Sequence, residues 1–248
     1  MVPLVDENRV ITCHGLQVMN DNPRLSIQVL KNLKKVKTIT SRTLAFQFGP
    51  LINAAGRLKD ADMAVRFLLS NHRQEAEKMA QILDATNTER REKESEMIQT
   101  ALKLADEQKN KPALILVSQE FHEGVNGIVA TRLVESFYKP VLILSENEGK
   151  IKGSGRSIPE LNLKEVLSDC SDLLERFGGH SAAAGCSLIP ENLKAFQNRF
   201  ITLCDERLPD LLNPKLHLDG TLDYLELNEQ FVEQLNRLQP FGEGNPEP

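Results

Sequence analysis

A long stretch without glycine or proline constrains this chain more than any other feature of its sequence. Neither residue occurs from Arg73 to Gln108, and they are the two residues that most weaken helices. Apolar residues recur there at helical spacing in two groups, Ala76, Met79, Ala80 and Leu83, then Met97, Ile98, Ala101, Leu102 and Ala105. The pattern predicts one helix, roughly 54 Å long at about 1.5 Å per residue. A single small domain does not need a helix of that length.

The middle of this predicted helix, residues 87–96, is polar on every face. A helix that is apolar at both ends and polar at its centre is typical of a bridge that crosses solvent between two domains. We favour that interpretation. The alternative is a helix with one buried side, whose run of charges is its solvated face.

The composition is that of a globular protein large enough for more than one packed unit. The 248 residues are 40% hydrophobic and 26% charged, both within the ordinary range. No window reaches the roughly 18 uninterrupted apolar residues of a membrane helix. The N-terminus, MVPLVDENRV, lacks the basic and then apolar run of a secretory signal. We therefore expect a cytoplasmic protein that has no membrane partner.

The charge balance argues against a broad nucleic-acid-binding surface. The net charge is -5 and the pI is about 5.7, whereas phosphate contact usually leaves a basic footprint. Tryptophan is absent and aromatic residues make up 5% of the chain, so few side chains can stack on bases. Any contact with DNA must therefore be local.

The cysteines indicate neither a disulfide framework nor a zinc site. Cys13, Cys170, Cys186 and Cys204 are scattered and form no CxxC pair. We interpret them as reduced packing residues.

The N-terminal part is predicted to consist of short helices followed by a loop. Residues 8–48 show helical apolar spacing and end at Gly49–Pro50, a strong breaker. Residues 49–60 have no clear period and are predicted to be a loop between helices. Asp60 and Asp62 imitate a metal-binding DxD motif, but Asp is common at the start of a helix, so we predict capping roles for them.

After Pro112 the pattern changes to alternating strands and helices. Continuous apolar runs at 113–118 and 140–145 predict two buried strands. The segment between them, 127–137, has helical spacing. These three segments together predict a βαβ unit.

A third strand is expected at 150–157. The apolar residues from Leu163 to Phe177 then follow a helical period, which predicts one amphipathic helix that ends at Gly178–Gly179. A further strand and a helix to about Arg207 complete this part. The predicted fold class is α/β, with helices covering a sheet.

The last part of the chain is predicted to begin a further unit. KLHLDGTLDY, residues 215–224, resembles a strand, and the chain ends in the turn-rich PFGEGNPEP. We expect this last unit to be incomplete.

Five segments together resemble one known family. They are GPLINAAGRLKDADMAV (49–65), HEGVNGIVATRLVE (122–135), KGSGRS (152–157), DLLERFGGHSAAAG (172–185) and LQPFGEGNPEP (238–248). Each resembles a segment of the RecJ-type single-stranded-DNA exonucleases, and the five stand in that family's order. FGGHSAAAG also resembles the GGGH motif of the wider DHHA1 domain, with Phe177 in place of the first glycine. The resemblance covers nearly the whole chain.

This resemblance implies a domain organisation and a chemistry. Residues 1–71 would be the C-terminal part of a DHH domain, 72–108 a connector helix, 109–209 a DHHA1 domain and 210–248 the start of an OB-fold domain. The family hydrolyses phosphodiesters with manganese or magnesium, held by DxD and DHH motifs that lie upstream of the segments matched here, and Asp60 and Asp62 are only an imitation of the first motif. We therefore expect a fragment that holds no metal by itself and that has no nuclease activity alone.

The resemblance also implies which residues bind the 5′ end of DNA. Arg57, Ser154 and Arg156 would form a pocket for its terminal phosphate, and a guanidinium fork suits such a dianion. Backbone amides freed by Gly153 and Gly155 would complete this anion cradle. For Arg57 the alternative is a surface ion pair with Asp60 or Asp62. For Arg156 the alternative is an exposed arginine at the end of a strand.

His180 is the catalytic residue that the resemblance implies, because the GGGH histidine contacts the scissile nucleotide. Gly178 and Gly179 would contact the substrate beside it. Without the resemblance, His180 would be interpreted as a surface histidine. His122 is assigned no role, although the glycines after it could expose amides to a phosphate.

Two classes of function remain open. The first is part of a 5′→3′ single-stranded-DNA exonuclease that acts in DNA repair and recombination. Its partner would be single-stranded DNA, and single-stranded-DNA-binding protein is a further candidate partner. The second is a noncatalytic DHHA1-type nucleic-acid-binding module. A fragment of an oligonucleotide or cyclic-dinucleotide phosphodiesterase is a further enzymatic alternative. The NAAGR and GNPEP segments favour the exonuclease.

Overall fold

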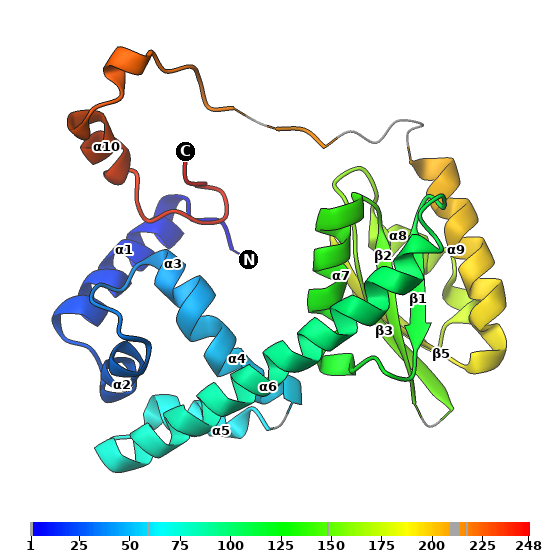
Figure 1. The fold of residues 1–248 in the computed structure, drawn as a ribbon, viewed down its shortest axis with the longest axis horizontal. Coiled ribbons are helices and arrows are strands. Elements are labelled where there is room, and N and C mark those ends of the chain that lie inside the picture. Colours follow the sequence, from blue (N-terminus) through cyan, green and yellow to red (C-terminus); the bar gives the residue numbers. More distant parts are fainter. Residues whose placement is uncertain (1, 59, 148, 209–213, 217) are drawn as a thin grey trace. The chain divides into compact units, whose positions relative to one another are not determined.

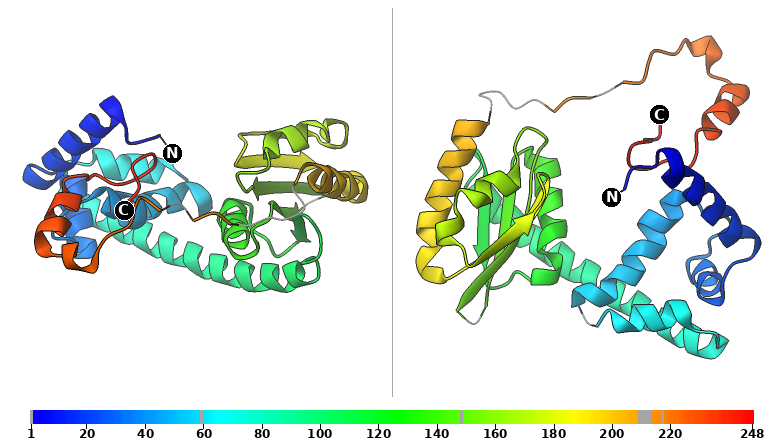
Figure 2. Two further views of the ribbon diagram at one scale, coloured as in Figure 1. Left: turned by 90° about the horizontal axis from the view of Figure 1, so that it is seen from above. Right: turned by 180° about the vertical axis from the view of Figure 1, so that it is seen from behind.

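The computed structural model describes residues 2–58, 60–147, 149–208, 214–216 and 218–248. The chain divides into two compact units, residues 1–88 together with 216–248, and residues 89–215. Among the described residues the strands form a five-stranded sheet in the second unit, and helices make up most of the rest (Figures 1 and 2). This mixture confirms the predicted α/β class. No helix in the described part of the chain is long and apolar enough to span a membrane.

Short helices make up the first unit before the long helix begins. They are α1 (Asp6–Asp21), α2 (Leu25–Lys34), α3 (Ser41–Thr43), a π-helix (Leu44–Phe48), α4 (Gly49–Leu58) and α5 (Asp62–Leu69). Their apolar faces meet in one core, whose buried residues include Leu30, Ile39, Phe48, Leu51, Phe67 and Leu83. The short helices predicted within residues 8–48 are confirmed.

The loop predicted at residues 49–60 was wrong, because most of this segment is helical. α3, the π-helix and α4 follow one another without a break. The wide π turn brings the Leu44 carbonyl against Gly49, where an added Cβ would lie 2.8 Å from that oxygen. Gly49 therefore permits the turn, and Pro50, which lacks an N–H to donate, follows directly on this wide turn within the continuous helical run.

α6 (Arg73–Asp106) is the long helix predicted from the stretch without glycine or proline. The division between the two units falls within it, after Thr88. Its buried residues are Ala76, Ala80, Leu83, Thr86, Asn87, Arg90, Met97, Ala101 and Ala105, most of which fall at helical spacing. The prediction of a middle that is solvated on every face was therefore wrong. Buried polar groups need partners, and Arg90 Nη1 donates to Glu94 Oε2 at 3.0 Å.

The strand predicted at 215–224 was also wrong within its described residues, and His217 lies outside them. Residues 218–223 form no strand, and a strand needs a neighbour to pair with its backbone groups. A 3-10 turn (Tyr224–Glu226) and α10 (Glu229–Asn236) follow. The predicted domain boundary at 209/210 lies outside the described residues.

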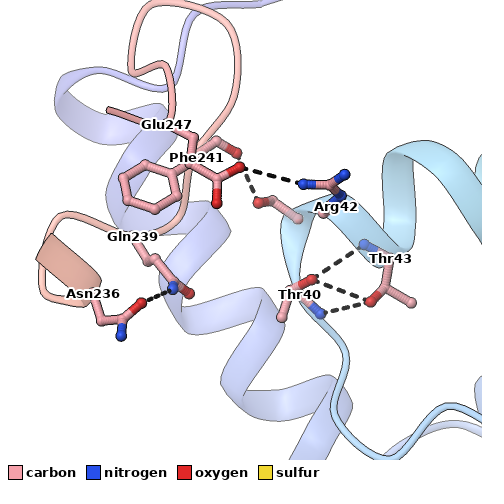
Figure 3. A network of polar contacts seen from close by, with 8 residues as sticks. Thr40, Arg42, Thr43, Asn236, Gln239, Phe241 and Glu247 are labelled. Carbon is pink, nitrogen blue, oxygen red and sulfur yellow. Dashed lines mark hydrogen bonds and ion pairs between the residues drawn. The ribbon is translucent and has the colours of Figure 1, made fainter. Parts of the chain in front are cut away.

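Residues 238–248 fold back onto N-terminal residues of the same unit (Figure 3). The contacts are hydrogen bonds from Leu4 N to Glu243 O at 2.6 Å, from Arg9 Nη2 to Leu238 O at 2.8 Å and from Ser41 Oγ to Phe241 O at 2.7 Å, and an ion pair between Arg42 and Glu247 at 3.4 Å. The turn-rich LQPFGEGNPEP segment is therefore a docked turn within the first unit.

The sheet of the second unit is built around the predicted βαβ unit. Its strands are β1 (Leu114–Ser118), β2 (Val141–Asn147), β3 (Lys150–Arg156), β4 (Arg176–Gly179) and β5 (Ala183–Leu188), in the order β1–β2–β3–β5–β4. β1 and β2 are parallel and are joined by α7 (Glu123–Phe137). The other neighbouring strands are antiparallel.

Helices cover both faces of this sheet (Figure 1). α7 packs on β2 and β3, whereas α8 (Leu163–Ser168) and α9 (Leu193–Arg207) enclose the core on the opposite face. Three buried cysteines, Cys170, Cys186 and Cys204, belong to that core. Burial raises the pKa of Cys170 to about 11 and the pKa values of the other two thiols to about 12. The packing role predicted for the cysteines is confirmed for these three, but it was wrong for Cys13, which is exposed.

The helix predicted from Leu163 to Phe177 was wrong in its second half. α8 ends at Ser168, and Phe177 lies in β4. The backbone of β4 pairs with β5, which satisfies its amide and carbonyl groups better than an exposed helical turn would. Gly178 and Gly179 are therefore strand residues and do not end a helix.

Candidate nucleic-acid-binding site

β3 carries two of the predicted phosphate-binding residues on one face of the sheet. Ser154 and Arg156 alternate along it with Gly153 and Gly155. An added Cβ would lie 2.3 Å from Leu144 at Gly153, and 2.5 Å from Leu142 at Gly155. The glycines therefore face the core beneath α8 and α9, and Ser154 and Arg156 face the α7 side.

The prediction that Gly153 and Gly155 free backbone amides for an anion was wrong. β3 pairs with β2 along one edge and with β5 along the other. The amides of a central strand are used by its neighbours. Any anion held here is therefore bound by side chains, and the glycines serve the close packing of the sheet.

Arg156 lies against the first turns of α7. Its Nη1 donates to the carbonyl oxygen of Gly155 at 2.8 Å. A Cβ added at Gly127 would lie 2.9 Å from its Nη2 and 3.5 Å from its Cζ. Gly127 therefore leaves the space that the guanidinium occupies. Sequence reasoning did not find this role, because the two residues lie far apart in the chain.

His122, which the sequence left without a role, is the N-cap of α7. Its Nδ1 accepts a hydrogen bond from the Gly124 N–H at 3.2 Å. Its own N–H donates to Met97 Sδ at 3.3 Å. An N-cap satisfies an amide that the helix leaves without an intrahelical partner. The Gly124 amide is therefore used by the cap.

The turn between β4 and β5 carries His180. Gly178 pairs with Gly185, and the His180 N–H donates to Ala183 O at 2.8 Å. Gly179 has a φ of +140°, and an added Cβ there would lie 2.4 Å from the same oxygen. Only glycine suits that position without strain. The turn leaves His180 exposed.

Arg156 and His180 come to the same end of the sheet. Arg156 pairs in register with Ala183, whose carbonyl accepts from His180. The Ser157 N–H also donates to Ala182 O at 3.0 Å. Three predicted site residues, Ser154, Arg156 and His180, are thus positioned by one antiparallel arrangement of β3, β4 and β5.

Arg57 lies in the first unit, in the last turn of α4, and is exposed. The predicted loop around it was wrong. Asp62 pairs with Arg66 at 2.6 Å, and the Asp62 N–H donates to Asp60 Oδ1 at 2.9 Å. Asp60 therefore satisfies an amide at the start of α5, as predicted. The capping role predicted for Asp62 was wrong, because its carboxylate pairs with Arg66 one turn further along the helix. A phosphate site that Arg57 shares with Ser154 and Arg156 stays a prediction.

A pocket of about 370 Å³ opens on the α7 side of the sheet and is lined by residues of α7, β3, β4 and β5. It is lined by Glu123, Asn126, Lys152, Gly153, Ser154, Arg176, Phe177, Gly185, Cys186 and Ser187. Asn126 donates to Ser145 Oγ at 2.8 Å and is almost fully buried. The sequence did not indicate Lys152, Arg176 or Ser187, because only strand register brings them together.

No group of three or more His, Cys, Asp or Glu residues within the described part of the chain could hold a metal ion. The donor set of these residues therefore does not fit a two-metal hydrolytic centre, which needs several converging carboxylate or imidazole ligands.

Comparisons with known proteins agree on one family. The DHHA1 domain model matches residues 110–206 and the RecJ OB domain model matches residues 218–248. The single-stranded-DNA-specific exonuclease RecJ of Bacillus subtilis is 36% identical over the whole chain, which covers 32% of that protein. The corresponding Escherichia coli protein is 35% identical, with 45% of its length covered.

Solved structures give the same result. RecJ from Thermus thermophilus in complex with Mg²⁺ matches with a TM-score of 0.90 at 33% identity, over all of this chain and 39% of that one. Its Mn²⁺ complex matches equally well, over 37% of that chain. The chain thus spans from about a third to just under half of the length of these relatives. On these matches, the chain belongs to the RecJ family and corresponds to the part that contains the DHHA1 domain.

Proposed function

We propose that this chain is the part of a 5′→3′ single-stranded-DNA exonuclease that binds the DNA and recognises its 5′ phosphate. The observation that carries the proposal is the common position of Ser154, Arg156 and His180 at one end of the sheet. Ser154 and Arg156 supply a hydroxyl and a guanidinium fork on one face. These groups suit a terminal phosphate, which has about one more negative charge than a phosphodiester.

His180 is the proposed catalytic residue, with Gly178 and Gly179 beside the substrate. Its exposed position in the β4–β5 turn leaves the imidazole accessible to a nucleotide. Arg57 would supply a second guanidinium for the same phosphate. In the complete enzyme, manganese or magnesium would support hydrolysis, in line with the ions named for the solved relatives. We further propose a cytoplasmic role in DNA repair and recombination, with single-stranded-DNA-binding protein as a candidate partner.

The first test compares single-stranded with duplex DNA. The 248-residue chain is titrated against a 3′-labelled oligonucleotide and against the blunt duplex of the same sequence, at one fixed salt concentration. We expect the single strand to bind at least about tenfold more tightly, a difference of about 1.4 kcal/mol. Equal affinities would contradict the proposed substrate class and would favour a general nucleic-acid-binding module.

A further inference from the structure

One row of side chains crosses three strands beside the proposed 5′-phosphate site. Lys152 on β3 pairs in register with Ser187 on β5, which pairs with Arg176 on β4. Residues opposite one another in antiparallel strands point to the same face. Lys152, Ser154 and Arg156 occupy alternate positions of β3, so their side chains point to the same face of the sheet.

The row lines the pocket on the α7 side of the sheet. Neighbouring strands lie about 4.8 Å apart, so the backbones at Lys152 and Arg176 are about 10 Å apart with Ser187 between them. Both long side chains can therefore reach one anion above Ser187. Gly185 lies next to Ser187 on the same face and leaves the approach open.

The charges of this pocket match one phosphodiester. Lys152 pairs with Glu123 at 3.3 Å, and both side chains are about half exposed. Such pairs contribute only about 0 to 1 kcal/mol and exchange partners readily. Among the described residues, Arg176 makes no ion pair. Two cations and one carboxylate leave a net charge of about one positive unit, in a chain whose overall charge is -5.

We propose that Lys152, Ser187 and Arg176 form a second anion site, which binds an internal phosphodiester of the single strand. The inference rests on the proposed function and extends it along the strand. Lys152 lies two residues from Ser154 and four from Arg156, about 7 and 14 Å at the rise of a β-strand. Those distances are comparable with one and two steps between phosphates of an extended single strand. The site therefore contacts DNA without regard to its sequence or to its 5′ end.

The test measures how binding depends on salt. A 3′-labelled oligothymidylate with either a 5′ phosphate or a 5′ hydroxyl is titrated against the 248-residue chain over a salt series. The variants are Lys152→Gln, Arg176→Gln and the double variant. The matched control is Lys194→Gln, which removes an exposed lysine of α9, on the helix layer over the opposite face. A fifth variant, Glu123→Gln, removes the carboxylate that competes with the phosphodiester.

The double variant should weaken binding of both oligonucleotides equally, by about tenfold. It should also lower the slope of log K against log salt by about 0.7, the value for one phosphate of a single strand. Glu123→Gln should tighten binding about twofold to threefold, a gain that damaged folding cannot produce. An unchanged slope in the double variant, a loss confined to the 5′-phosphorylated strand, or weaker binding by Glu123→Gln would overturn the site. If instead the wild-type chain binds the two oligonucleotides equally well, the proposed 5′-phosphate pocket is refuted. The salt dependence of the double variant still tests the site of Lys152, Ser187 and Arg176.

Discussion

Gly127→Ala should disturb the proposed phosphate site while leaving the fold intact. The added Cβ would lie 2.9 Å from Nη2 of Arg156, 3.5 Å from its Cζ and 3.6 Å from its Nη1. Ordinary contacts are longer than the first of these distances, so the guanidinium must move by about half an ångström. The neighbour that moves is the end of a flexible side chain and not backbone. The substitution therefore displaces the fork without breaking α7.

The expected changes in stability and binding have opposite signs. Alanine is favoured over glycine within a helix by about 1 kcal/mol, so the free energy of unfolding should stay equal or rise slightly. Loss of one charged hydrogen bond costs about 1.5 to 3 kcal/mol, and a displaced fork should lose part of that. We expect about a threefold to tenfold smaller preference for a 5′-phosphorylated over a 5′-hydroxyl single strand.

The assay combines urea unfolding with paired titrations of the two oligonucleotides at fixed salt. The matched control is Gly15→Ala in α1, where an added Cβ meets nothing within 4 Å. It should give the same helical stabilisation with an unchanged phosphate preference. If Gly127→Ala keeps the full preference while Arg156→Ala loses it, the argument that Gly127 seats Arg156 is refuted.

Three further predictions concern other parts of the second unit. In an enzyme reconstituted with the metal-binding segment, His180→Ala should lower turnover more than DNA affinity; unchanged turnover at saturating substrate would count against its role. Gly179→Ala should lower the free energy of unfolding by about 1 to 3 kcal/mol, because its φ of +140° is strained for any other residue, and an unfolding midpoint equal to that of the wild type would refute this. Because burial raises the pKa of the three buried thiols above the ordinary 9.0, the folded state binds their protons more tightly than the unfolded state. Their contribution to stability should therefore be complete below about pH 9 and should fall as the pH rises from 9 toward 11; a cysteine-to-alanine triple variant with the same pH dependence would contradict it.

Local patterns were sufficient to predict the elements whose cause is local. The βαβ unit follows from two apolar runs around a helical period, and α6 follows from the absence of helix breakers between Arg73 and Gln108. The same kind of pattern was misleading where the spacing of apolar residues fits both one long helix and a helix followed by a strand. From Leu163 to Phe177 the apolar positions fit one helix, yet α8 is followed by β4. Pairing with β5, which no local pattern records, decided that segment.

The site depended still more on contacts that are distant in sequence. Ser154 and Arg156 were proposed as site residues only through the resemblance to a family, because an arginine after glycines is usually just exposed. The space that Gly127 leaves for Arg156 and the row of Lys152, Ser187 and Arg176 come from helix packing and strand register. At Gly49–Pro50 the local pattern predicted a break that the structure does not have. This pair usually interrupts helices, but here it lies within a helical run, directly after a π turn.

The most direct test of the central claim is whether the preference for a 5′ phosphate depends on Arg156. The wild-type chain, Arg57→Ala and Arg156→Ala are titrated in parallel with 5′-phosphorylated and 5′-hydroxyl single strands at one salt concentration. Arg132→Ala, which removes an exposed arginine of α7 paired with Glu135, is the control. We expect the wild-type chain and the control to prefer the phosphorylated strand by roughly tenfold or more, and the two site variants to lose most of that preference. Equal affinities of the wild-type chain for the two strands, or an undiminished preference in both site variants, would contradict the account.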